Sequence, residues 1–93
     1  MFECIIPMYG IPREITEQRE VKVKLRDEAT MAEVIAAMKE KIPSLEGPVF
    51  RTGENRLNEN YKFNINGNFY YAGMDFKLNN SDRIALLMPV TGG

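Results

Sequence analysis

The stretch Arg83-Ile84-Ala85-Leu86-Leu87-Met88 is apolar after its first residue and has the length of a single strand. An unbroken apolar run of this kind is typical of a strand in the middle of a sheet, covered on both faces. The chain opens with a similar run, Phe2-Glu3-Cys4-Ile5-Ile6-Pro7-Met8, which also predicts a buried strand. We therefore expect the first and last strands to lie side by side at the centre of one sheet.

The second strand is predicted from a strict alternation over residues 20–26. Val21, Val23 and Leu25 fall on one face and charged residues on the other, as in a strand with one solvated side. Gly10 and Pro12 end the first strand, so we expect a polar turn over residues 13–19 to join the two strands as a hairpin.

One helix is predicted next. Thr30-Met31-Ala32-Glu33 fits a capping box, in which the Thr and Glu side chains each accept a hydrogen bond from the other residue's backbone. The helix should end near Ile42, because Pro43 cannot continue it. Its apolar stripe, expected to pack on the sheet, consists of Met31, Val34, Ile35, Met38 and Ile42.

The second half of the chain begins with a loop over residues 44–60, which has no periodicity and contains possible anchors at Val49 and Phe50. A tolerated surface insertion is the favoured interpretation, with a functional loop as the alternative. Asn66-Gly67 then predicts a tight hairpin between strands at 61–66 and 68–71, and Leu78 is expected to enter the core. The fold class is therefore α+β, with a mixed sheet of about five strands and one main helix on one face.

Composition excludes several classes of function. The 93 residues carry 12 Lys and Arg against 13 Asp and Glu, so no basic excess indicates nucleic-acid binding. The chain has no His and a single Cys, Cys4, so we expect no metal site and no Ser-His or Cys-His pair. The longest apolar run, Ile84 to Val90, is far shorter than the roughly 20 residues of a membrane span. No signal peptide is recognisable, and we expect a cytoplasmic protein that does not bind membranes.

The last five residues are Pro89-Val90-Thr91-Gly92-Gly93, directly after a core strand. We expect a folded domain over 1–89 and a flexible tail over 90–93. Glycine has no side chain, and four extended residues reach about 13–14 Å, so the tail could enter the pocket of another enzyme. A carboxylate is a poor acyl donor, so that enzyme would first have to activate it, for example by adenylation. The alternative is a frayed end without function.

Four segments resemble the ubiquitin-like β-grasp proteins of the sulfur-carrier group, which comprises MoaD, ThiS and the archaeal small modifier proteins. They are Arg13-Glu14-Ile15-Thr16, the helix 30–42, Asn66-Gly67 and, most specifically, the ending 82–93. The chain departs from the usual motifs at Glu17 and Ser81, where Gly is usual, and at Met88, where Pro is usual.

The resemblance implies that Gly93 is adenylated by an ATP-dependent enzyme of the ubiquitin-activating type and then converted to a thiocarboxylate. Its sulfur would pass to the molybdopterin precursor, in a complex with the large subunit of molybdopterin synthase. The chain would be a co-substrate and not an enzyme, with no bound cofactor. The alternatives are a modifier joined through Gly93 to lysines of target proteins, with both roles able to coexist, and an adaptor whose tail is idle.

Other residues are weaker candidates. Phe69, Tyr70 and Tyr71 cannot all face inward on a pleated strand, so an exposed member could contribute to a docking surface. Packing of two of the three in the core is nevertheless the favoured interpretation. Lys22 and Lys24 could contact a partner or accept a conjugate but fit a solvated face, and Cys4 fits a small buried residue.

Overall fold

The computed structural model describes residues 1–87 of the chain. Five strands are present in this part. The strands β1 (Phe2–Pro7) and β2 (Glu20–Leu25) pair antiparallel, and β3 (Lys62–Ile65), β4 (Asn68–Tyr71) and β5 (Ile84–Leu87) form an antiparallel sheet in the order β4-β3-β5.

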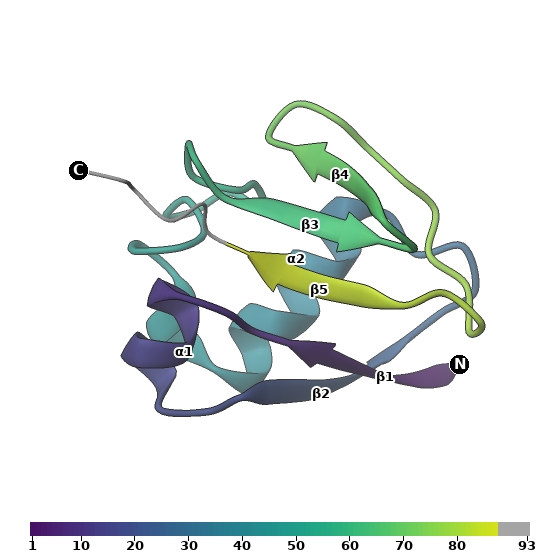
Figure 1. Cartoon of the computed structure of the whole chain (residues 1–93), viewed down its shortest axis with the longest axis horizontal. Coiled ribbons are helices and arrows are strands. Elements are labelled where there is room, and N and C mark those ends of the chain that lie inside the picture. The colour runs from purple at the N-terminus through teal and green to yellow at the C-terminus, as the bar shows by residue number, and fades with distance from the viewer. Residues whose placement is uncertain (88–93) are drawn as a thin grey trace.

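The two sheets meet where β1 passes β5 (Figure 1). Met8 and Leu86 form a parallel bridge, and the Tyr9 N–H donates to the Leu86 carbonyl oxygen at 3.1 Å. The strands therefore follow the order β2-β1-β5-β3-β4, with the first and last strands adjacent. This confirms the predicted arrangement of a mixed, five-stranded α+β fold.

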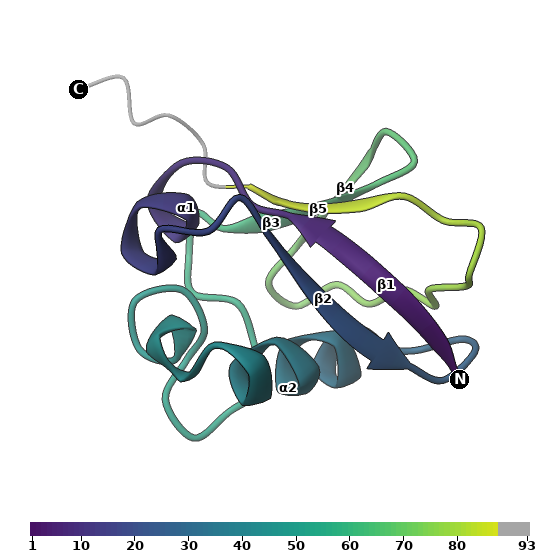
Figure 2. The same ribbon diagram turned by 90° about the horizontal axis from the view of Figure 1, so that it is seen from below.

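The main helix, α2 (Met31–Lys41), covers one face of the sheet (Figure 2). Its capping box is formed as predicted: the Glu33 N–H donates to Thr30 Oγ1 at 3.3 Å, and the Thr30 N–H donates to Glu33 Oε1 at 3.2 Å. The helix ends at its C-cap Ile42, before the short 3-10 helix η1 (Pro43–Leu45), also as predicted. No helix within residues 1–87 is long and apolar enough to cross a membrane.

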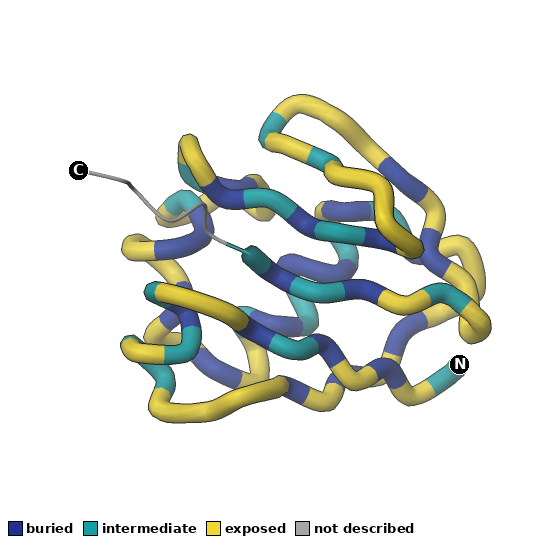
Figure 3. The backbone as a smooth tube through the Cα atoms, in the orientation of Figure 1, coloured by how far each residue is buried: buried dark blue, intermediate teal, exposed yellow. Residues whose placement is uncertain are grey.

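The core lies between α2 and the inward face of the strands (Figure 3). Phe63 is at its centre, with its ring centroid 6.5 Å from that of Phe50 and 5.7 Å from that of Phe76. Leu78 is fully buried, as predicted, and exchanges two backbone hydrogen bonds with Ala29, of 3.1 and 2.8 Å.

The prediction that β5 is covered on both faces was wrong, and β1, predicted as a buried strand, is buried on one face only. Cys4 and Ile6 are buried, but Ile5 is 49% exposed, and Ala85 and Leu87 on β5 are partly exposed. The physical reason is that α2 shields only one side of the sheet, so the outward apolar residues are left in contact with solvent.

A short helix, α1 (Ile11–Thr16), begins before the predicted polar turn over 13–19 and takes up its first four residues. Pro12 suits the first helical turn, where its missing N–H and fixed φ cost nothing. Glu17 ends the helix in a left-handed conformation, with φ of 57°, and donates its backbone N–H to the Arg13 carbonyl oxygen at 2.8 Å. This is the position at which the β-grasp motif usually has Gly, the residue that adopts positive φ most readily.

The hairpin at Asn66-Gly67 is confirmed. Both residues have positive φ, 53° and 90°, as a type I′ turn requires. The turn sets the register in which Phe63 pairs with Tyr70 and Lys62 pairs with Tyr71.

The long segment between α2 and β3 is not a simple surface insertion, contrary to the favoured interpretation. Val49 and Phe50 are fully buried, as are two further residues of the segment, Leu45 and Leu57. Apolar anchors of this number make the segment part of the core, because each buried side chain of this size stabilises the fold by about 1.5–3 kcal/mol relative to exposure.

Candidate functional site

The candidate reactive tail follows β5, the strand held between β1 and β3. The structure describes β5 as far as Leu87. The predicted site residues Pro89, Val90, Thr91, Gly92 and Gly93 lie outside the described residues, as does Met88. What the structure does describe is the surface around the point from which the tail departs.

That surface is the side of the sheet opposite α2, which we call the open face (Figure 2). It consists of the outward side chains of the five strands, since successive side chains of a strand point to opposite faces. These side chains are Glu3, Ile5, Pro7, Glu20, Lys22, Lys24, Lys62, Asn64, Phe69, Tyr71, Ala85 and Leu87.

The middle of the open face is apolar. Ile5 and Pro7 from β1 lie beside Ala85 and Leu87 from β5, because Met8 and Leu86 are bridged. A shallow hollow of about 340 Å³ adjoins this strip and is lined by Pro7, Asn64, Asn66, Gly67, Arg83, Ile84 and Ala85. An apolar strip exposed on a strand face is a typical docking surface for another protein.

The three consecutive aromatic residues divide between the two faces of the sheet. Phe69 and Tyr71 are 44% and 46% exposed on the open face. Tyr70 packs inward, with its ring centroid 5.4 Å from that of Phe76. The expectation that two of the three pack in the core is therefore wrong, since strand alternation places the first and third on the open face.

Two cations lie against aromatic rings at the edges of the apolar strip. Lys62 Nζ lies 4.2 Å from the centroid of Phe69 and 5.7 Å from that of Tyr71. On the other side, the Arg13 guanidinium lies 5.0 Å from the centroid of Tyr9, and Arg13 Nε donates to the Met8 carbonyl oxygen at 3.0 Å. These contacts place two positive charges beside the end of β5.

Cys4 and Lys22 are among the other candidate residues, on β1 and β2. Cys4 faces the core, where burial raises the pKa of its thiol and keeps it protonated. No group of three potential metal ligands occurs within residues 1–87. Lys22 is exposed and lies 3.9 Å from Glu3 across the β1–β2 pair, a distance typical of a weak surface pair.

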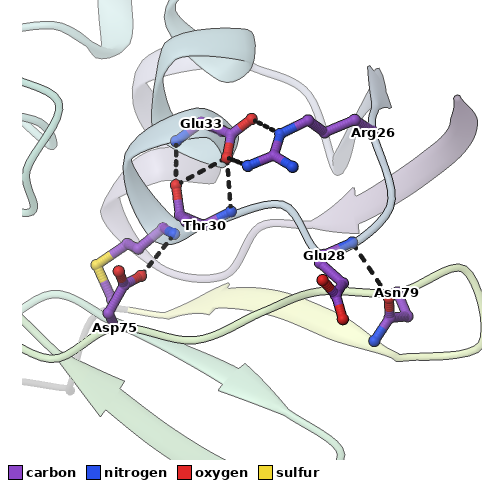
Figure 4. Close-up of polar contacts among 7 residues, drawn as sticks. Arg26, Glu28, Thr30, Glu33, Asp75 and Asn79 are labelled. Carbon is purple, nitrogen blue, oxygen red and sulfur yellow. Dashed lines mark hydrogen bonds and ion pairs between the residues drawn. The ribbon is translucent and has the colours of Figure 1, made fainter.

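A separate polar cluster lies at the N-terminal end of α2, beside the loop that leads into β5 (Figure 4). Arg26 makes a bidentate contact with Glu33, with distances of 2.5 and 2.7 Å. This contact, together with the hydrogen bonds from Thr30, lowers the pKa of Glu33 to about 2. Asp75 accepts a hydrogen bond from the Met31 N–H at 3.0 Å, and Asn79 accepts one from the Glu28 N–H at 3.1 Å. The cluster connects the start of α2 with the loop before β5, so we assign it a structural role.

Four members of the candidate docking surface were not predicted from the sequence, namely Ile5, Tyr9, Arg13 and Lys62. Ile5 could have been identified from strand alternation, because it stands out of phase with the buried Cys4 and Ile6. The position of Arg13 had no sequence signal, since it depends on α1 turning back toward the end of β1.

Comparisons with known proteins agree with this architecture. The sequence is 26% identical, over 91 residues, to small archaeal modifier protein 3 of Haloferax volcanii, covering 98% of this chain and 99% of that protein. The fold matches the crystal structure of small archaeal modifier protein 1 from Haloferax volcanii with a TM-score of 0.79 and 25% identity, over 99% of this chain and 100% of the other.

A putative molybdopterin converting factor subunit 1 from Pyrococcus furiosus shares the fold, with a TM-score of 0.70 and 16% identity over 97% of this chain and 100% of that one. The structural neighbours have the ubiquitin-like β-grasp fold. The sequence profile of the ThiS family matches residues 6–93. The chain therefore belongs to the ThiS family and has the ubiquitin-like β-grasp fold.

Proposed function

We propose that this protein is a sulfur carrier whose reactive group is the carboxyl of Gly93. The observation that carries the proposal is the placement of Pro89-Val90-Thr91-Gly92-Gly93 directly after β5, the strand that ends between two cations and an apolar strip. A folded body with a docking surface beside a slender tail suits a protein that presents its own end to an enzyme.

The proposed reaction has two steps. An oxygen of the Gly93 carboxylate attacks the α-phosphorus of ATP on the activating enzyme and displaces pyrophosphate, giving an acyl adenylate. Hydrosulfide then attacks the acyl carbon, and AMP leaves with the bonding electrons, giving a thiocarboxylate. The described residues of this chain contribute docking and positioning, while the partner enzyme binds ATP and lowers the barrier.

We further propose molybdopterin as the destination of the sulfur. The Pro-Val-x-Gly-Gly ending and the fold shared with a molybdopterin converting factor subunit support this destination. The receiving partner would be the large subunit of a molybdopterin synthase, which would hold the catalytic groups. The dependence on ATP is consistent with a cytoplasmic setting.

A protein-modifier role is the second candidate, and the similarity over nearly the whole chain to small archaeal modifier proteins favours it. In this reaction the ε-amine of a target lysine, and not hydrosulfide, attacks the adenylated Gly93 and releases AMP. Both roles share the first step, so one chain can perform both.

Intact-mass analysis separates the two roles. The purified protein is incubated with the activating enzyme of its own cell, ATP and hydrosulfide, and a sulfur carrier should exchange one carboxyl oxygen of Gly93 for sulfur. Modified lysines bearing a remnant of Gly92-Gly93 in digests of cell protein would support the modifier. A chain lacking Gly92 and Gly93 serves as the control. If cells with this shortened chain behave like cells with the unchanged chain, both roles are contradicted and the adaptor role is the one that remains.

A further inference from the structure

Two cations at the open face, Arg13 and Lys62, lie against aromatic rings. Within residues 1–87, three contacts place a cation over an aromatic ring, and they involve Arg13 with Tyr9 and Lys62 with Phe69 and Tyr71. All three lie on the open face or at its rim, beside the apolar strip.

The two cations stand on opposite sides of the end of β5. Lys62 is the register partner of Leu87, and so borders the strand from β3. On the β1 side, Arg13 Nε bonds the carbonyl oxygen of Met8, the residue bridged to Leu86. The last residue of β5, Leu87, therefore lies between two positive charges.

Neither cation has a carboxylate within 4.0 Å among the described residues. The four ion pairs of this part of the chain use other cations, namely Lys22, Arg26, Lys39 and Arg51. A ring face attracts a cation without using its N–H donors. Arg13 gives its Nε–H to Met8, so the Lys62 ammonium and the terminal N–H groups of the Arg13 guanidinium stay available for a carboxylate of another molecule.

We propose that Arg13 and Lys62 form an electrostatic clamp for an acidic rim on the activating enzyme, around the entrance that receives the tail. The partner surface would be apolar where it covers Pro7, Ala85 and Leu87 and would carry a carboxylate opposite each cation. This inference rests on the proposed function, because it names the partner as the enzyme that activates Gly93. Charged rims mainly set association rate, orientation and salt dependence, so the clamp selects the partner and aligns the tail.

The test measures the dissociation constant of the full-length chain and its purified activating enzyme at low and moderate salt. Arg13→Gln and Lys62→Gln should each weaken binding by about two- to fivefold at low salt, the range expected for exposed ion pairs. The double variant should also bind with a flatter salt dependence than the unchanged chain, because two screened attractions are gone.

Two further variants separate the clamp from a merely structural role. Arg13→Lys keeps the charge but loses the Nε–H donor to Met8, so it should bind within about twofold of the unchanged chain if the charge is what matters. Lys77→Gln removes an exposed cation on the loop beside the start of α2 and should leave binding unchanged. Thermal unfolding of each variant reports any loss of stability.

The clamp is overturned if both neutralisations leave the affinity and its salt dependence unchanged, or if Arg13→Lys is as weak as Arg13→Gln. The proposed function fails separately. If the enzyme binds the chain with the predicted salt dependence but never adenylates Gly93, Arg13 and Lys62 are still a docking site for an acidic surface, but the sulfur-carrier and modifier roles both fail.

Discussion

At the scale of single residues, Thr30 and Glu33 determine how α2 begins. Each side chain satisfies a backbone N–H that the first turn of a helix leaves unpaired. Both residues were identified from the sequence because the capping box is a local pattern, with a fixed spacing and a fixed chemistry.

Replacing Thr30 by Ala should lower the free energy of unfolding by about 1 kcal/mol, the usual cost of losing an N-cap side chain. Urea unfolding measures the change. Thr52→Ala is the matched control, because Thr52 is an exposed loop residue and its loss should change stability by less than about 0.5 kcal/mol. Equal effects of the two variants would contradict the role of the cap.

Glu33 predicts a defined pH dependence. Its pKa falls to about 2 in the folded protein, from 4.5, because Arg26 and the Thr30 N–H favour the carboxylate. A depressed pKa gives stability that is present above pH 4.5 and is lost as the pH falls toward 2. As the pH falls from 4.5 to 2, the free energy of unfolding should therefore decrease less in Glu33→Gln than in the unchanged chain.

Urea unfolding at several pH values between these limits tests the prediction. Glu59→Gln, a change at an exposed loop carboxylate, is the control and should keep the slope of the unchanged chain. An unaltered slope in Glu33→Gln would show that the contact with Arg26 does not persist in solution.

At the scale of elements, the segment between α2 and β3 shows where sequence reasoning stops. Periodicity identifies β2 and α2 because each presents one face to a single neighbour. The segment has no repeat, and its buried residues depend on contacts that are distant in sequence. One such contact comes from Lys39 on α2, whose Nζ donates to Glu46 Oε2 at 3.1 Å and to the Arg51 carbonyl oxygen at 2.9 Å.

Replacing Lys39 by Met should loosen this segment while α2 persists, since Met keeps the apolar stem and helix propensity. Glu46 also accepts the Gly53 N–H at 3.0 Å, so the amide hydrogen of Gly53 should exchange faster in the variant. Lys41→Met, at an exposed position of the same helix, is the control. Unchanged exchange at Gly53 would contradict the role of Lys39.

At the scale of the whole molecule, the strand order could be predicted, whereas the docking surface could not. Apolar first and last strands correctly indicated neighbours at the centre of the sheet. The same apolarity was misread as burial on both faces, because composition alone does not show that one helix covers one side. The outward residues Ile5 and Leu87 are instead the centre of the open face.

If the activating enzyme docks on the open face, Ile5→Lys should weaken its binding by about five- to tenfold. Burying half of an Ile side chain contributes about 1 kcal/mol, and the lysine would also place a charge in an apolar contact. Met74→Lys is a close control, because Met74 is 47% exposed, similar to Ile5 at 49%, but lies in the loop beside the start of α2. Equal weakening by both changes would contradict docking on this face.

The central claim is that the activating enzyme adenylates Gly93, and exchange of labelled pyrophosphate into ATP measures that step most directly. The enzyme should catalyse the exchange with the unchanged chain, and deletion of Gly93 alone should reduce it to the background without this protein. Exchange that continues undiminished after the deletion would contradict the account.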